Sequence, residues 1–272
     1  MPNLIEIDDL HDPRIEIYRD IRERDLVGRA GLFVAEGRVV VEKLVGSAHH
    51  QPLSLLIASK RVNALHSVLS RLPDDVPVYV AAQGVIDAIA GFPLHRGILA
   101  IGRRTEVPTA GDLLSQFGES ATVLVLSGIA NHDNMGGIFR NAAAFGVNAV
   151  LLDADCCDPL YRKAIRVSVG ATLLVPFAQM ARQDDPVELL ERHAFSPVAL
   201  SPAGTCPLME WRPGPRTAVL LGAEGPGLSA DLVRRVPSVQ IAMSAGFDSL
   251  NVATTSGIVL HHISACPFEL AG

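Results

Sequence analysis

Apolar residues in the second half of the chain form short continuous runs, and segments with helical spacing separate them. Six runs predict β-strands: residues 121–129, 148–153, 172–179, 197–203, 217–222 and 238–243. Helical patterns follow at residues 135–146, 186–195 and 229–236, and a last helix falls within 249–265. Continuous apolar runs are typical of strands that are buried on both faces. The alternation therefore predicts an α/β fold with an open, mostly parallel sheet and helices on both sides.

The first half reads as a smaller mixed α/β region. An arginine-rich helix is expected over 14–29, and a short strand is expected within 31–37. Further strands are expected at 53–59, 76–82 and 96–104, with a helical stretch at 63–72. The stretch 104–118 contains proline and glycine, so we place a domain boundary there. This gives domains 1–105 and 118–272, and 272 residues suit two domains of about 150 each.

Composition excludes disorder, because 49% of residues are hydrophobic and only 19% are charged. The net charge of −6 provides no overall positive field for a nucleic acid. Residues 1–105 carry 13 Lys+Arg and 13 Asp+Glu, whereas the remainder carries 10 and 16. An RNA partner would therefore need a local basic patch.

The sequence lacks the patterns of a signal peptide, a membrane span, a disulfide framework and a zinc site. The acidic N-terminal stretch does not resemble a signal peptide, and no apolar run reaches the ~18 residues of a membrane span. The spacing of the four cysteines fits neither a disulfide framework nor a zinc site. We therefore expect reduced thiols, no metal, no membrane association and a cytoplasmic protein. We interpret Cys156, Cys157, His261 and His262 as structural.

Unusual polar residues gather in three strand-to-helix loops. In the first, residues 131–146, Asn134 is expected as the helix N-cap, and Gly136 and Gly137 allow close approach of another backbone or a ligand. Arg140 lies off the apolar stripe and can point toward the loop. A capped helix with a surface arginine remains the alternative.

The second loop, residues 220–229, is rich in glycine but has the wrong order for a dinucleotide fingerprint and lacks the P-loop lysine. Glu224 at its tip disfavours a phosphate and favours hydroxyls, amines or a positive centre. The alternative is a tight turn in which Ser229 caps the next helix.

The third loop leads from residue 241 into the last helix. Ser249 and Asn251 stand early in it, and small residues follow at 253–257. Such a helix packs closely against a threaded loop, a second subunit or simply the core.

Together these loops resemble the three motifs of the SpoU (TrmH-type) RNA ribose 2′-O-methyltransferases. The similarity rests on Asn134-x-Gly136 with Arg140, Gly222-x-Glu224-Gly225-x-Gly227, and Ser249-Leu250-Asn251, and it covers residues 118–266. Residues 162–171 also look like the family segment between the first two motifs. The first half is similar to the substrate-binding domain that often precedes this fold, through residues 31–45 and 95–101.

The resemblance implies the SPOUT-type α/β fold with a C-terminal trefoil knot, S-adenosylmethionine as cofactor, and a homodimer with the site near the subunit interface. The implied reaction is methyl transfer to a ribose 2′-hydroxyl of rRNA or tRNA. Gly-rich loops can hydrogen-bond adenine and ribose, and apolar side chains can enclose the adenine. The implied cofactor-binding residues are Gly222, Ala223, Glu224, Gly225, Ile241, Met243, Leu250 and Asn251.

The resemblance assigns catalysis to Arg140, with Asn134 positioning it. Glu224, Ser249 and Asn251 match the other polar residues that line the family's site. A guanidinium is a poor general base, so Arg140 either acts as the base or holds the neighbouring phosphate and acidifies the hydroxyl. The sequence leaves both roles open.

RNA contact is expected at Arg140 and in the first domain, at Arg14, Arg19, Arg22 and Arg29, with Arg24 and Arg38 nearby. A solvated amphipathic helix is the alternative, because five acidic residues are interleaved between Asp12 and Asp25. Arg162, Lys163 and Arg166 form a second candidate patch.

Two other functions compete with this interpretation. One is a non-catalytic RNA-binding relative of the same fold, and the other is an oxidoreductase with a dinucleotide site. Cofactor binding separates the three, because they would bind S-adenosylmethionine, nothing and NAD respectively.

Overall fold

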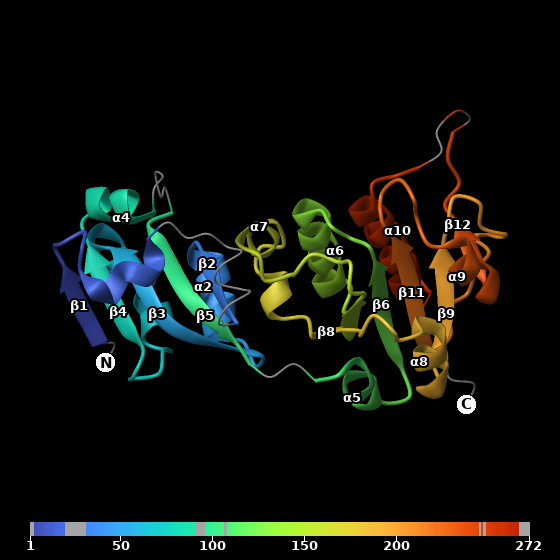
Figure 1. Ribbon diagram of the computed structural model, residues 1–272, viewed down its shortest axis with the longest axis horizontal. Helices are drawn as coiled ribbons and strands as arrows, with labels where there is room; N and C mark the ends of the chain where they lie inside the picture. Colours follow the sequence, from blue (N-terminus) through green and yellow to red (C-terminus); the bar gives the residue numbers. More distant parts are fainter. Residues whose placement is uncertain are drawn as a thin grey trace. The chain divides into compact units, whose positions relative to one another are not determined.

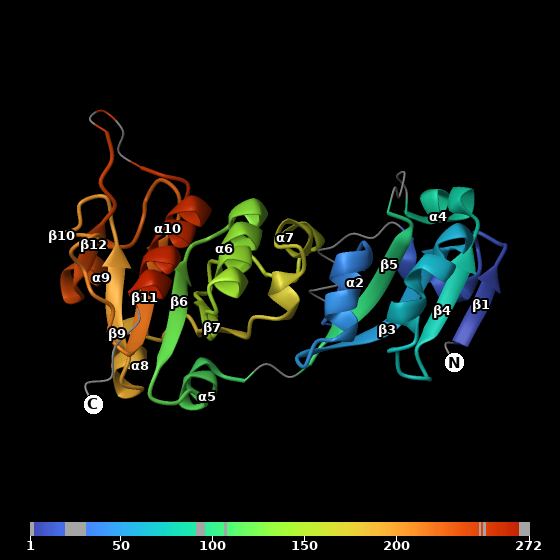
Figure 2. The ribbon, with the colours of Figure 1, turned by 180° about the vertical axis from the view of Figure 1, so that it is seen from behind.

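The structure is a computed structural model that describes residues 3–19, 31–90, 96–105, 108–244, 246 and 249–266. Its contacts divide the chain into two compact units. The first unit contains residues 1–106 and 160–174, and the second contains residues 107–159 and 175–272. Residues 160–174, which lie in the second half of the sequence, thus pack with the first unit. Figures 1 and 2 show the chain from opposite sides.

The described part of the first unit is built on a mixed five-stranded sheet with the order β1-β4-β3-β5-β2. β5 is antiparallel to both of its neighbours, whereas β4 is parallel to β1 and β3. The strands are β1 (Asn3–Ile7), β2 (Leu32–Glu36), β3 (His50–Ala58), β4 (Pro77–Ala81) and β5 (Ile98–Arg104). The helices are η1 (Pro13–Tyr18), α2 (Arg38–Val45), η2 (Ser59–Arg61), η3 (Asn63–Leu65), α3 (His66–Leu69), α4 (Gln83–Ala90), α7 (Arg162–Val167) and η4 (Ala171–Leu173).

Polar contacts attach residues 160–174 to β2 and α2. Arg162 donates from Nε and Nη2 to one carboxylate oxygen of Glu36, at 3.0 and 2.7 Å. Lys43 Nζ donates to the carbonyl of Val169 at 2.6 Å. Glu36 is 9% exposed, so a charged partner is needed at this position.

The second unit carries a parallel sheet in which the described strands follow the order β10-β12-β9-β11-β6-β7-β8. The central strands are apolar on both faces, as their continuous hydrophobic runs predict. The strands are β6 (Ala121–Ser127), β7 (Ala149–Leu152), β8 (Phe177–Gln179), β9 (Ser196–Leu200), β10 (Cys206–Pro207), β11 (Arg216–Gly222) and β12 (Ser238–Gln240). The helices are α5 (Ala110–Ser115), α6 (His132–Ala144), α8 (Pro186–Arg192), α9 (Ala230–Arg235) and α10 (Val252–Ala265).

The last helix, α10, lies beside α6, and both helices have small residues at the contact (Figures 1 and 2). A Cβ atom added to Gly137 would come within 2.7 Å of the Ala253 Cβ. The Asn141 amide donates to the Ala253 carbonyl at 2.7 Å and to the Ser256 hydroxyl at 2.9 Å. The small residues of the last helix therefore serve, at least in part, close packing within the chain.

Most of the predicted elements are present, and two predictions are wrong. Residues 172–179 were expected as one strand, but β8 begins at Phe177, because Gly170 takes a φ of +77° and starts the 3₁₀ turn η4. The helix expected over 14–29 is a short 3₁₀ helix that ends at Tyr18. The rest of that prediction falls on residues 20–30, which lie outside the described residues.

The partly buried Cys156 thiol and the two histidines of α10 have contacts within the chain. Burial raises the pKa of the Cys156 thiol to about 12 and that of Cys157 to about 11. The Cys156 thiol donates to the Leu126 carbonyl and accepts from the Ile129 amide, both at 3.3 Å. His262 stacks on Trp211 and hydrogen-bonds its carbonyl at 2.9 Å.

The described residues include neither a helix that could span a membrane nor a cluster that could hold a metal ion. None of the helices there combines the length and apolar character that crossing a bilayer requires. The same ranges contain no group of three or more His, Cys, Asp or Glu side chains arranged to hold a metal ion.

The contact between α6 and α10 gives a stability prediction. Gly137→Val should destabilise the second unit by about 1–3 kcal/mol, because the added methyl groups force the two helices apart. The melting temperature should then fall by roughly 2–4 °C per kcal/mol in thermal denaturation. Gly84→Val is the control, since nothing lies within 4 Å of the added Cβ at that helix position. Equal melting temperatures for the two variants would contradict the packing argument.

Candidate functional site

Three strand-to-helix connections of the second unit meet at the carboxyl ends of neighbouring strands. The first leads from β6 into α6, the second from β11 into α9, and the third from β12 toward α10. β12, β9, β11 and β6 are consecutive in the sheet, so these connections leave the same edge. Ligands of open parallel sheets bind at this edge.

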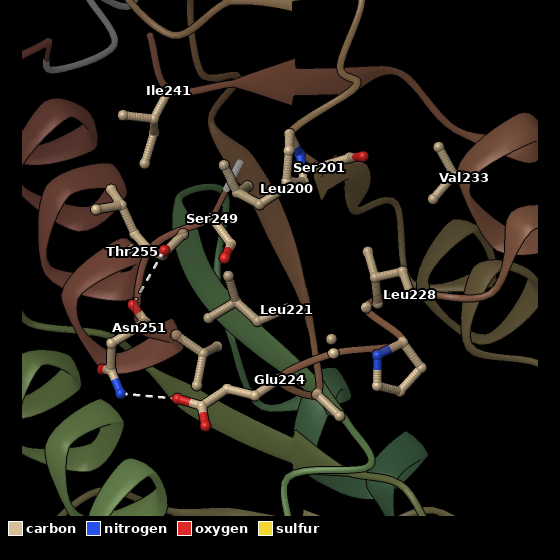
Figure 3. A pocket seen from close by; sticks show the side chains of 18 of the residues that line it. Leu200, Ser201, Leu221, Glu224, Leu228, Val233, Ile241, Ser249, Asn251 and Thr255 are labelled. Carbon is tan, nitrogen blue, oxygen red and sulfur yellow. Dashed lines mark hydrogen bonds between the residues drawn. The ribbon is translucent and has the colours of Figure 1, made fainter. Parts of the chain in front are cut away.

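One side chain, Asn251, joins the three connections. Its amide nitrogen donates to Asn134 Oδ1 and to Glu224 Oε1, each at 2.8 Å (Figure 3 shows the second bond). Its side-chain oxygen Oδ1 accepts from the backbone amides of Ala253 and Thr254 at 2.9 and 3.2 Å, which caps α10. Asn251 therefore uses both of its donors and its acceptor.

Asn134 was predicted as the N-cap of α6, and this is wrong. The cap is Asn131, whose side chain accepts from the amides of Asp133 and Asn134 at 2.8 and 3.4 Å. Asn134 lies in the first turn and is 6% exposed. Its side chain is thus free to accept the hydrogen bond from Asn251.

A cavity of about 550 Å³ lies between the loop after β11 and the segment before α10 (Figure 3). All eight residues expected to bind a cofactor line it, and so does Ser249. They are Gly222, Ala223, Glu224, Gly225, Ile241, Met243, Ser249, Leu250 and Asn251. Among its lining residues there is no lysine or arginine.

The loop after β11 is closed tightly on itself. A Cβ on Gly222 would lie 2.3 Å from backbone atoms of Gly227 and Leu228, so only glycine fits there. Ala223 and Gly227 form an isolated bridge, and Gly225 takes a φ of +90°. The close approach therefore accounts for the glycine that starts this motif.

Sequence reasoning missed part of the lining. Leu200, Ser201 and Pro202, at the end of β9, form one wall, and Leu228 and Val233 lie nearby. The apolar pattern of residues 197–203 predicts a strand and gives no sign of a ligand site. The rule that ligands lie beyond strand ends could have pointed to Ser201, because β9 stands between β11 and β12.

Arg140 lies outside this cavity. It is exposed and borders an open groove of about 630 Å³ between α6 and α10. Gly137, Asn141, Phe145, Ala253, Thr254, Gly257, Ile258 and His261 form the rest of that groove. Within the described ranges the Arg140 side chain makes no hydrogen bond or ion pair, and Asn134, the residue expected to position it, bonds instead to Asn251.

The arginines expected to contact RNA in the first unit are only partly described. Arg14 forms a bidentate pair with Asp12, and these hydrogen bonds lower the pKa of that carboxyl to about 2. Arg19 donates to the Asp12 carbonyl at 3.2 Å. Arg22, Arg24 and Arg29 lie outside the described residues. Both described arginines are thus already engaged with Asp12.

A parallel α/β unit with a Gly-rich cavity at the carboxyl edge of its strands defines a small-molecule-binding α/β protein. The sequence model of the SpoU rRNA Methylase family matches residues 121–261, which span the whole site. The chain belongs to this family.

Relatives extend the match to the first unit. The chain is 40% identical to an uncharacterized tRNA/rRNA methyltransferase of Mycobacterium bovis over 267 residues, which cover 94% of this chain and 90% of that one. It is 28% identical to a 23S rRNA (guanosine-2′-O-)-methyltransferase of Acinetobacter baylyi, over 70% of this chain and 78% of the relative. The crystal structure of an AdoMet-bound rRNA methyltransferase from Sinorhizobium meliloti has the same fold, with a TM-score of 0.79 at 22% identity. That match covers 98% of this chain and 99% of the other.

The bridge made by Asn251 can be tested apart from the helix cap. Asn251→Asp keeps the capping oxygen but loses the amide donor, and it places a second carboxylate beside Glu224. Amide hydrogen exchange in residues 222–227 should rise about tenfold or more, because a hydrogen bond to a charged group such as Glu224 contributes about 1.5–3 kcal/mol.

Protection in the first turn of α10 should persist in Asn251→Asp. Asn251→Ala is the comparison, since it removes the cap as well and should loosen both segments. Unchanged exchange of the loop in both variants would mean that Asn251 does not hold it.

Proposed function

We propose that this protein transfers a methyl group from S-adenosylmethionine to a ribose 2′-hydroxyl of rRNA or tRNA. One observation carries the proposal: Asn251 binds side chains of the other two motifs at the mouth of a Gly-rich cavity. Membership of the SpoU rRNA Methylase family supports the reaction class.

The cavity suits S-adenosylmethionine better than a dinucleotide. Its volume of about 550 Å³ lies within the roughly 300–1,000 Å³ of small-molecule sites. Ile241, Met243 and Leu250 provide apolar walls for the adenine, and backbone groups of 222–225 provide donors and acceptors for adenine and ribose. A pyrophosphate would meet the carboxylate of Glu224 and no cation among the lining residues. When bound, S-adenosylmethionine supplies a methyl group on a positively charged sulfonium, which the Glu224 side of the cavity tolerates.

We assign to Arg140 the role of binding the RNA substrate. Its exposed guanidinium has five donors in a planar fork, so it is suited to hold a phosphate next to the target ribose. As the hydroxyl oxygen bonds to the methyl carbon, the bond from that carbon to sulfur breaks, the electron pair stays on sulfur and the hydroxyl proton passes to water. A fixed cation nearby stabilises the charge that builds on the oxygen. Asn134 accepts a hydrogen bond from Asn251 and so positions Asn251 at the cavity. Ser249 and Glu224 line the cavity directly.

The proposal includes a trefoil knot in the second unit. Its support is that Asn251, the N-cap of α10, follows β12 in the chain and hydrogen-bonds both Glu224 in the loop after β11 and Asn134 in α6. We assign residues 1–105 to substrate binding and place the protein in the cytoplasm, where free cysteines such as those found here persist.

A homodimer is proposed along the groove between α6 and α10. Apolar and small residues line this groove beside Arg140, and Ile258 is 37% exposed there. A second copy seated on it would bring a partner surface next to Arg140, which fits a site near the subunit interface.

The dimer gives a direct prediction. Ile258→Asp should convert the protein to monomers in light scattering, because it places a charge in an apolar contact. Leu10→Asp is the control, since Leu10 is similarly exposed at 39% but belongs to the first unit. A wild-type monomer, or a dimer that tolerates Ile258→Asp, would contradict the proposed interface.

The reaction can be measured with purified protein, methyl-labelled S-adenosylmethionine, and ribosomal and transfer RNA from a strain that lacks the gene. Label should appear in a 2′-O-methylated nucleoside after digestion, and the labelled fraction identifies the RNA class. If no label appears and calorimetry shows no binding of S-adenosylmethionine, the protein is a non-catalytic RNA-binding relative.

Arg140→Ala should reduce methyl transfer by about 10²-fold or more, the usual cost of removing a charge-stabilising donor. Affinity for S-adenosylmethionine should stay unchanged in calorimetry, because Arg140 lies outside the cavity. Arg140→Lys should recover only part of the rate, since an ammonium lacks the planar fork. Near-normal turnover in the alanine variant would remove Arg140 from the mechanism.

A further inference from the structure

The charge of the chain is divided unequally between its two units. The first unit, residues 1–106 and 160–174, carries 16 Lys+Arg and 14 Asp+Glu, a net charge of +2. The second unit carries 7 and 15, a net charge of −8. A polyanion is therefore attracted to the first unit and repelled by most of the second.

One edge of the first sheet brings together strand ends that are distant in sequence. β5 lies between β2 and β3 and is antiparallel to both, so the ends of β2 and β3 lie beside the start of β5. The Gly37 amide donates to the Ile98 carbonyl at 3.1 Å, and the Ala58 amide donates to the Gly97 carbonyl at 3.0 Å. We call the four cations at these strand ends the basic edge: Arg38, Lys60, Arg61 and Arg96.

Two glycines make room for the arginines of the basic edge. The Arg96 Cδ atom lies 2.7 Å from the place that a Cβ on Gly37 would occupy. The Arg61 Cγ atom lies 3.2 Å from the corresponding place on Gly97. Both glycines have positive φ, of +90° and +62°. The two arginine side chains thus lie against bare backbone, and both residues are exposed.

The acidic groups of this edge already have partners. Glu36 accepts both hydrogen bonds from Arg162, and Glu42 pairs with Arg38 at 2.7 Å. Within the described part of the chain, the side chains of Arg61 and Arg96 form no hydrogen bond or ion pair. Their donors are therefore available to an external anion, whereas those of Arg14 are bound to Asp12.

The start of α2 adds to the positive potential. Gly37 is its N-cap and provides no side-chain acceptor, so the first amides of α2 point toward the same edge without a side-chain cap. Uncapped amides at a helix start attract phosphate oxygens. Arginine is suited to the same ligand, because its planar fork matches a phosphate with two parallel hydrogen bonds.

We propose that the basic edge binds backbone phosphates of the RNA substrate, with Arg61 and Arg96 as the principal contacts. The proposal rests on the proposed function, because it takes the RNA as the methyl acceptor. It moves the main RNA contact of the first unit from Arg14 and Arg19 to strand ends that no sequence motif joins. Phosphate contacts position the RNA and carry no base specificity.

The test compares two double variants of the full chain. Arg61→Ala with Arg96→Ala removes the two free guanidinium groups. The control, Arg71→Ala with Arg103→Ala, removes two exposed arginines of the same unit at the opposite ends of α2 and β5. The probe is a 23S rRNA transcript, and its affinity is measured between 50 and 200 mM salt, over which range phosphate contacts weaken about 10-fold or more.

We expect the edge variant to bind the transcript roughly 10–100-fold more weakly at low salt. The slope of log K against log salt should fall by about 1.4–1.8, which corresponds to two lost phosphate contacts. The control should keep the slope of the wild-type protein, and both variants should bind S-adenosylmethionine normally. Arg61→Lys with Arg96→Lys should restore most of the slope, because the slope depends on the number of positive charges that contact phosphates.

Two outcomes would overturn the proposal. Either the edge variant keeps the wild-type affinity and slope, or the control loses as much as the edge variant. If the wild-type protein itself neither bound nor methylated ribosomal or transfer RNA, the proposed function would fail and this inference with it. Methyl transfer by the wild-type protein together with full binding by the edge variant would overturn this inference alone.

Discussion

The site depends on the side-chain amide of Asn251. Its oxygen caps α10, and its nitrogen donates to Asn134 and Glu224 at the same time. No other side chain of this length offers one acceptor and two donors, since aspartate lacks the donors and leucine lacks all three. The buried oxygen of Asn134 would lose its partner without it, and a buried polar group without a partner is costly. One residue of the third connection therefore holds both the first turn of α6 and the loop after β11, and that loop lines the cavity.

That bridge is possible only because α6 and α10 approach closely. Gly137 faces Ala253, and a Cβ on Gly257 would lie 3.2 Å from the Asn141 amide. Asn141 in turn donates to the backbone and side chain of α10. Larger residues would move α10 outward and carry Asn251 away from Asn134. Ala253 and Gly257, which permit this approach, are thus needed for the site, although they do not line the cavity.

The sequence predicts those features that a local pattern records. Strands such as β6 and β11 are continuous apolar runs because both faces are buried, and the eight expected cofactor residues follow strand ends. The sequence does not show which of two similar residues will take one structural role. Asn131 and Asn134 both stand near the start of α6. Asn131 is the cap because its side chain accepts from two backbone amides of the first turn. The basic edge could not be predicted at all, since the strand order alone brings Arg61 beside Arg96.

The separation of charges follows from the chemistry of the two ligands. A cavity for a cationic sulfonium benefits from Glu224 and from the lack of lysine and arginine among its lining residues. The unit that contains the cavity has a net charge of −8, which makes it a poor surface for a polyanion. In the proposed function, the cations that hold RNA belong to the first unit and to Arg140, and none of them is among the residues that line the cavity. A chain with one acidic and one weakly basic unit can bind both ligands without either site weakening the other.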